Sequence, residues 1–104
     1  MNAPKQLAEA VRESLRSVID PEIGLNIVDV GLVYDVDADG SGVVTVTMTT
    51  TTQGCPATGY LRQGAEEAAA RTAGVAAAKV NLTYDPPWGP ELMSETAREI
   101  LGFG

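Results

Sequence analysis

Residues 31–50 read GLVYDVDADGSGVVTVTMTT, and this stretch decides the fold. Its last eight residues, 43–50, read VVTVTMTT, in which valine or methionine alternates with threonine from Val44 to Thr49, the two-residue period of a strand with one buried face. Its first part, 31–37, is predicted to be the partner strand. Between the two, 39–42 reads DGSG, and glycine accepts the positive φ angles that tight turns need. The stretch therefore predicts a β-hairpin.

The rest of the chain predicts helices and one more strand around this hairpin. Apolar residues recur at helical spacing over 4–19, and Asp20-Pro21 ends that helix because the residue before proline avoids the α region. A second helix, rich in alanine, is predicted over 56–73. The remaining elements are an ordered loop, a third strand and a short last helix, over 20–31, 78–84 and 94–101.

The predicted element order is α-β-β-α-β-α. It is typical of an α+β fold in which helices cover a small mixed sheet made of the hairpin and the third strand. We expect one domain over residues 1–104, because two hydrophobic cores would not fit in a chain of this length.

The composition excludes several classes of function. The chain has 7 basic and 14 acidic residues, a net charge of −7 and no histidine. Because affinity for nucleic acids and anionic membranes comes from basic residues, neither is an expected partner. Without histidine, the Ser-His-Asp triad, the Cys-His dyad and the HExxH zinc site are excluded. A signal-peptide pattern and a membrane-length apolar run are absent from the sequence, so we expect a cytoplasmic protein.

Cys55 is the first candidate for chemistry, since it lies between Gly54 and Pro56 at the start of the predicted second helix. A helix N-terminus offers free N–H groups and about half a positive charge, and both stabilise a thiolate. We expect Cys55 to be partly accessible, with a thiol pKa below the ordinary ~8.5. A thiolate is a nucleophile and a ligand for soft metals. The alternative is a small buried side chain without chemistry.

Two further groups of polar residues are candidates. Asp20, Glu22 and Asp29 can bind a hard cation or move a proton, although Asp20 also suits the closing of a local turn. Thr51 and Thr52 can hydrogen-bond an anion or a thiolate.

These residues come from two loops at the open end of the hairpin. A two-stranded hairpin returns the chain to its starting edge, so the loop before the first strand and the loop after the second are neighbours. We therefore expect one surface pocket to be formed by Asp20, Glu22, Thr51, Thr52 and Cys55.

Trp88 lies in the proline-rich stretch 85–90, DPPWGP. It is either an anchor for a partner or a lid over the core, and we favour the lid.

Three stretches together resemble a known family. They are DPEIGLNIVDVGLVY at 20–34, TTQGCP at 51–56 and PPWGPELMSETAREILG at 86–102. In this order they are similar to the SufT-type and PaaD-like family of metal–sulfur cluster assembly proteins, over about residues 5 to 103. The resemblance implies a fold similar to the carboxy-terminal domain of NifU-type proteins and a role in the maturation of iron–sulfur proteins.

The resemblance also implies which residues act. The family's functional pattern falls on Asp20, Glu22, Thr51, Thr52 and Cys55, with Asp29 inside the NIVDxGLVY stretch. The chain departs from the family at Gln53, where a proline is common. It also lacks the additional cysteines that PaaD-like members carry after this domain, which weakens a role with a ring oxygenase.

Several functions remain to be weighed. The favoured one is a non-enzymatic assembly factor in which Cys55 holds or hands over iron or an iron–sulfur cluster, with client apoproteins and other assembly proteins as partners. Because a cluster takes four thiolates and the chain has one cysteine, we expect transient binding completed by a homodimer, a partner or a small thiol. The alternatives are an adaptor that does not use Cys55, an auxiliary protein of an aromatic-ring oxygenase system, and a cysteine-based enzyme with a carboxylate base.

Overall fold

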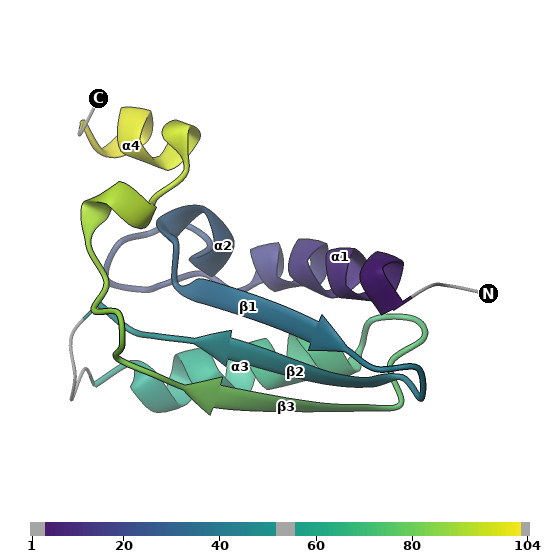
Figure 1. Ribbon diagram of the computed structural model, residues 1–104. Helices are drawn as coiled ribbons and strands as arrows, with labels where there is room; N and C mark the ends of the chain where they lie inside the picture. Colours follow the sequence, from purple (N-terminus) through teal and green to yellow (C-terminus); the bar gives the residue numbers. More distant parts are fainter. Residues whose placement is uncertain (1–3, 52–55, 103–104) are drawn as a thin grey trace.

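The computed structural model describes residues 4–51 and 56–102, and it confirms the predicted α+β fold (Figure 1). The three strands lie within two residues of their predicted bounds. None of the helices in the described ranges has the length and apolar content needed to cross a bilayer. In chain order the elements are α1 Pro4–Ser14, the 3-10 turn η1 Leu15–Ser17, α2 Ile27–Val30, β1 Val33–Ala38, β2 Val43–Met48, α3 Thr58–Ala70, β3 Ala77–Leu82, the 3-10 turn η2 Pro90–Leu92 and α4 Glu95–Leu101.

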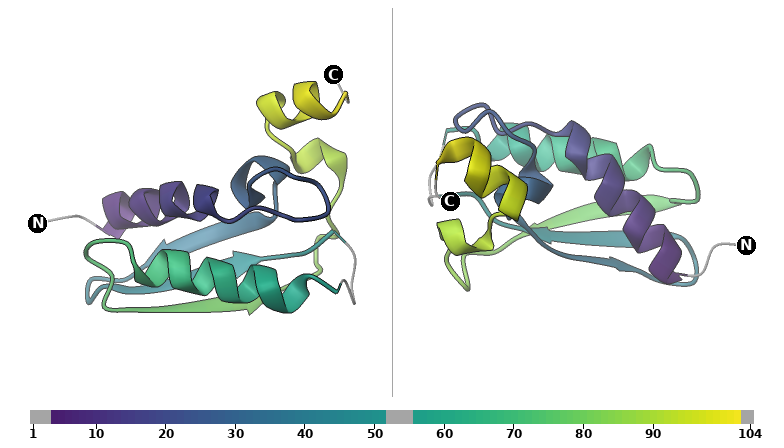
Figure 2. Two further views of the ribbon diagram at one scale, coloured as in Figure 1. Left: turned by 180° about the vertical axis from the view of Figure 1, so that it is seen from behind. Right: turned by 90° about the horizontal axis from the view of Figure 1, so that it is seen from above.

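The strands form one mixed sheet in the order β1-β2-β3. β1 and β2 pair antiparallel as the predicted hairpin, whereas β2 and β3 pair parallel. α3 makes the crossover between the two parallel strands, because a parallel pair cannot be joined by a tight turn. Seen from behind in Figure 2, α1 and α3 both cover the same face of the sheet.

The core lies between this covered face and the two long helices. On β2, Val44, Val46 and Met48 are fully buried while the residues between them are not, so the alternation in the sequence places one face inward. The stripe of the first helix, from Leu7 to Val18, is buried as predicted. On α3 the buried side chains are one leucine and three alanines, and such small side chains allow a close approach to the sheet.

The opposite face of the sheet is polar. The register places Asp37, Thr45 and Lys79 in one row across the three strands, and Asp35 lies on the same face of β1. The two aspartates and Lys79 are exposed. This one-sided burial explains why the strands alternate in polarity instead of being apolar throughout.

The predicted helix 4–19 is wrong at its carboxyl end. The α-helical part stops at Ser14, a 3-10 turn follows, and Val18 is extended. Ile19 then forms an isolated antiparallel bridge with Asn26, so the chain must leave the helix before it. Val18 is buried although it is extended, so it continues the apolar stripe beyond the point where the helix ends.

The predicted loop 20–31 is also only partly correct, since it contains the one-turn helix α2. Asn26 caps this helix, because its side chain accepts a hydrogen bond from the N–H of Asp29 at 2.9 Å. Gly31 ends it with a φ of 88°, a conformation that glycine adopts without strain. A helix of four residues is too short for a period of 3.6 to be visible in the sequence.

The chain beyond β3 crosses the end of the sheet and packs over α2. Trp88 donates its Nε1–H to the carbonyl of Val30 at 2.9 Å and packs half-buried against the core, which confirms its interpretation as a lid. Ser94 caps α4, because its side chain accepts a hydrogen bond from the N–H of Ala97 at 3.1 Å. On this helix Ala97 is buried, whereas Ile100 is 63% exposed.

Candidate functional site

The loop after η1 contains the first predicted site residue, Asp20, which is 3% exposed. Its Oδ1 accepts hydrogen bonds from the backbone N–H groups of Glu22 at 2.8 Å and Ile23 at 3.3 Å. The N–H of Asp20 donates to Leu25 O at 2.9 Å, and the N–H of Gly24 donates to Asp20 O at 2.7 Å. Asp20 therefore has the turn-forming role that the sequence left open as an alternative, and this role engages one of its carboxylate oxygens.

Glu22 lies in the same loop and its side chain is exposed. The base of the loop is closed by the bridge between Ile19 and Asn26 and by a hydrogen bond from Ile27 N to Val18 O at 3.0 Å. A loop fixed at both ends loses little conformational entropy when a side chain on it takes a ligand. The predicted role of Glu22 in contacting a cation or a partner stays a prediction.

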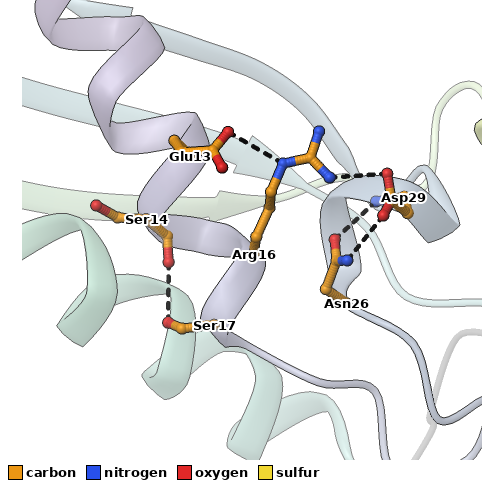
Figure 3. A network of polar contacts seen from close by, with 6 residues as sticks. All are labelled: Glu13, Ser14, Arg16, Ser17, Asn26 and Asp29. Carbon is orange, nitrogen blue, oxygen red and sulfur yellow. Dashed lines mark hydrogen bonds and ion pairs between the residues drawn. The ribbon is translucent and has the colours of Figure 1, made fainter.

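Asp29 joins three helical segments, as Figure 3 shows in part. Its Oδ1 accepts from Nη1 of Arg16 at 2.9 Å, and its Oδ2 accepts from Nδ2 of Asn26 at 2.8 Å. Nε of Arg16 also donates to Glu13 at 3.1 Å, and the carbonyl of Asp29 accepts from the N–H of Ser94 at 2.8 Å. The hydrogen bond from Asn26, helped by Arg16, holds the pKa of Asp29 below its ordinary value against the effect of burial. Asp29 thus has a structural role between η1, α2 and the start of α4.

The threonine run lies at the carboxyl end of β2. Thr49 and Thr50 are buried and Thr51 is half-buried. The N–H of Thr49 donates to Leu32 O at 2.8 Å, and its hydroxyl donates to Thr50 O at 3.2 Å. The hydroxyl of Thr50 lies 2.9 Å from that of Tyr84. Thr49 and Thr50 therefore continue the sheet at the carboxyl end of β2 and have structural hydrogen bonds there.

The loop that contains Asp20 and Glu22 and the carboxyl end of β2 lie at the same end of the molecule, as the views in Figures 1 and 2 agree. Thr51 follows β2 at that end. Thr52 and Cys55 lie outside the described residues. The convergence of all five predicted residues on one pocket therefore stays a prediction.

The next helix after Cys55 in the chain is α3, which begins at Thr58. The N-cap residue, Ala57, makes no capping hydrogen bond through its side chain. Among the described residues, the buried Oγ1 of Thr58 finds no hydrogen-bond partner. N–H groups in the first turn of a helix can receive a negatively charged group, including a thiolate.

Metal ligands are not clustered in the part of the chain that the structure describes. No three histidine, cysteine, aspartate or glutamate side chains within 4–51 and 56–102 are grouped closely enough to hold an ion. A groove of about 280 Å³ between η1 and α3 is lined by residues such as Tyr60 and Gly64, and one of about 440 Å³ beside β1 is lined by residues such as Arg12 and Leu92. Neither groove is lined by the predicted site residues.

Sequence reasoning missed three residues around this end of the fold: Arg16, Asn26 and Tyr84. The spacing N-x-x-D at 26–29 is a helix N-cap signal and could have located α2. Arg16 and Tyr84 had no local signal, because their partners lie 13 and 34 positions away in the chain.

The fold and the loop sequences define a known class of protein. The model of a family described as iron-sulfur cluster assembly protein matches residues 8–82, and the chain belongs to this family. The matched range includes both loops that contain predicted site residues. The family resemblance inferred from the sequence is thereby confirmed.

Curated relatives are similar over most of the chain. The Fe-S protein maturation auxiliary factor of Porphyromonas gingivalis is 42% identical over 98 residues, which is 94% of this chain and 93% of the relative. The factor YitW of Bacillus subtilis is 40% identical and covers 93% of this chain and 95% of its own length. The factor SufT of Staphylococcus aureus is 41% identical over 82% of this chain and 97% of its own length.

Solved structures share the fold. A domain of unknown function from Bacillus anthracis has a TM-score of 0.91 at 36% identity and covers 97% of this chain and 96% of its own. A conserved hypothetical protein from Thermotoga maritima has a TM-score of 0.78 at 48% identity, covering 90% and 92%. A solution structure from Mycobacterium tuberculosis has a TM-score of 0.51 at 36% identity, covering 99% and 90%, and is described as associated with [Fe-S] complex assembly and repair.

Proposed function

We propose that this protein is an auxiliary factor in the maturation of iron–sulfur proteins in the cytoplasm. The observation that carries the proposal is its 40–42% identity to three curated factors of this kind, over 93–97% of their lengths. The similarity extends over almost the whole length of each of these relatives. The association of the Mycobacterium tuberculosis neighbour with [Fe-S] assembly and repair supports the same role.

In this proposal Cys55 holds or hands over iron or a cluster as cargo. Glu22 and Asp20 supply carboxylate charge from the first loop, and Thr51 and Thr52 supply hydroxyls from the second. Thiolates are the preferred protein ligands of iron–sulfur clusters. The geometry supports the proposal because the loop of Glu22 and the carboxyl end of β2 lie at the same end of the molecule.

The cargo is shared with a partner rather than enclosed by one chain. A cluster takes four thiolates as a rule, and the sequence has a single cysteine. The remaining ligands come from a client apoprotein, another assembly protein, a second copy of the chain or a small thiol. A factor of this kind acts by transient binding, so it needs no enzymatic machinery.

The test is the maturation of a client enzyme in a strain that lacks the chromosomal copy. Cys55→Ala is expected to leave the activity of an iron–sulfur enzyme at the level of the deletion strain, while the amount of the enzyme protein is unchanged. Glu22→Gln is expected to restore activity partially, because it keeps the shape and removes the charge. Asp37→Asn, on the exposed polar face of the sheet, is the matched control and should restore activity fully.

The adaptor alternative makes the opposite prediction for the same strain. If the protein only docks clients, Cys55→Ala restores activity as well as the wild type does, and the role assigned to the thiol is wrong. The alternative of a ring-oxygenase auxiliary protein is not favoured, since the curated relatives are named Fe-S protein maturation auxiliary factors.

A further inference from the structure

The groove beside β1 combines apolar walls with one arginine. Its volume is about 440 Å³, and its lining comes from α1, α2, β1 and the segment around η2. Val28, Val33 and Leu92 are apolar members of that lining, and Arg12 joins them from α1. Leu92 is 39% exposed and Arg12 is half-buried. A group that fills this groove therefore needs an apolar part and a part that can accept hydrogen bonds from a guanidinium.

The guanidinium of Arg12 has no carboxylate within ion-pair distance in the part of the chain that the structure describes. Arg16, one helical turn further along, differs because it pairs with both Glu13 and Asp29. A charge beside apolar walls attracts an opposite charge more strongly than one in open water does, since the effective dielectric constant is lower there. Arginine also binds carboxylates with two parallel hydrogen bonds. The groove therefore favours a carboxylate that lies next to an apolar side chain.

The chain presents this combination on its own last helix. Of the five large apolar side chains that are exposed in the described ranges, three lie between positions 92 and 101. The most exposed of these is Ile100, at 63%. Glu99 is exposed beside it, about 100° around the helix axis, whereas Ala97 is buried. Seen from above in Figure 2, α2 lies between α1 and α4, so α4 and one wall of the groove flank the same short helix.

We propose that this face is an interface between two copies of the chain, in which α4 of each copy occupies the groove of the other. Ile100 of one copy packs against the apolar walls, and its Glu99 pairs with Arg12 of the second copy. Because both halves of the contact belong to one chain, it is made twice about a two-fold axis and the assembly closes as a dimer. The inference goes beyond the proposed function and uses none of the residues that act in it.

The experiment measures the dissociation constant of the dimer by sedimentation velocity of the full chain over a series of protein concentrations. A reducing agent is present, so that Cys55 cannot join two copies through a disulfide. The contact involves short elements, so we expect a weak dimer whose fraction rises with concentration.

The variants exchange the charges of the proposed pair. Arg12→Glu and Glu99→Arg each place like charges opposite one another and should raise the dissociation constant about tenfold or more. An equal mixture of these two variants should dimerise within about threefold of the wild type, because both contacts of the mixed dimer again join opposite charges. Ile100→Ala should also weaken the dimer about tenfold, since it removes the apolar anchor.

Arg62→Glu and Glu66→Arg are the matched controls. Both positions are exposed on α3, and the two variants change the net charge by the same amounts as the test variants. Each should dimerise as the wild type does. Circular dichroism checks the fold of every variant, and if Arg12→Glu does not fold, Glu99→Arg and Ile100→Ala decide the question.

A wild-type chain that stays monomeric at every concentration would overturn the proposal and leave a segment of another protein as the occupant of the groove. A dimer that these variants do not weaken, or that the controls weaken equally, would place the interface elsewhere. Failure of the mixture to dimerise would contradict the pairing of Arg12 with Glu99. All of these measurements use the isolated protein, so they are separate from the maturation assay of Cys55→Ala. The proposed function and this inference can therefore fail independently.

Discussion

Asp29 is the residue at which the polar contacts between η1, α2 and the start of α4 converge. Its carboxylate accepts hydrogen bonds from Asn26 and Arg16, and these contacts lower its pKa from the ordinary value of 3.8. A carboxyl group whose pKa is lower in the folded state adds stability above its unfolded-state pKa. That stability disappears as the pH falls through the folded-state value.

Asp29→Asn is therefore expected to lower the free energy of unfolding at neutral pH by about 1–2 kcal/mol, the usual cost of losing a charged hydrogen bond. The difference from the wild type should shrink as the pH falls below about 4 and through the lower folded-state pKa, because the carboxylate is protonated first in the unfolded state and then in the folded state. Urea unfolding at a series of pH values measures both effects. Asp37→Asn, at an exposed carboxylate, should change stability by less than about 0.5 kcal/mol. A difference that is constant down to pH 2 would contradict the assigned role of the charge.

Trp88 contributes through its indole N–H as well as through its ring. Trp88→Phe keeps an aromatic side chain against the core and removes the hydrogen bond to Val30 O. We expect a loss of about 1 kcal/mol, measured by urea unfolding with circular dichroism because the variant has no tryptophan. Tyr60→Phe, at a side chain that is 61% exposed, should be neutral. If the Trp88 variant is as stable as the wild type, the hydrogen bond to Val30 O does not contribute to stability and the prediction is wrong.

At the scale of elements, Gly31 is the point where α2 ends and the segment at η2 packs against it. Its φ is 88°, and a Cβ at this position would overlap the carbonyl group of Leu92. Gly31→Ala is expected to cost more than about 2 kcal/mol, since it combines backbone strain with a clash against main-chain atoms. A thermal melt measures the loss.

Gly24→Ala is the control that separates these two costs. Its φ is 85°, but nothing lies within 4 Å of the added Cβ. We expect a cost of about 1 kcal/mol from the backbone conformation alone. If the two variants lose the same amount of stability, the clash with the Leu92 carbonyl does not add to the cost of Gly31→Ala.

The elements also show what the sequence could predict and what it could not. The alternation in Val43–Met48 and the helical stripe from Leu7 predicted β2 and α1, because each pattern is repeated several times over one buried face. The end of α1 and the whole of α2 depend on single contacts, such as the bridge of Ile19 with Asn26. A single contact produces no periodic spacing of apolar residues, so the sequence pattern does not predict it. The same holds for the site. The sequence indicated which residue types could act there, but it did not show whether Asp20 forms a turn or binds a ligand, because both roles suit an aspartate in a loop.

At the scale of the whole molecule, the single cysteine limits what the purified protein can hold. After anaerobic reconstitution with iron and sulfide, we expect cluster absorption only when a small thiol is present, because one chain supplies one of the four thiolates. The absorption should disappear on gel filtration without the thiol and be absent in Cys55→Ala. A stable cluster at one per chain in thiol-free buffer would contradict transient binding. Iron counting and visible spectra of the two proteins are the measurements.

The central place of β2 has a consequence for aggregation. The strand Val43–Met48 reads VVTVTM, which has neither charge nor proline, a composition that favours pairing between chains when an edge is open. In the finished sheet both of its edges are occupied, and the outer strands carry Asp35, Asp37 and Lys79, charges that discourage further pairing. During synthesis, β1 can cover one edge at once, whereas the other stays open until α3 and Ala77–Leu82 have emerged. The nascent chain therefore exposes its most aggregation-prone strand for the whole time that the crossover helix takes to be made.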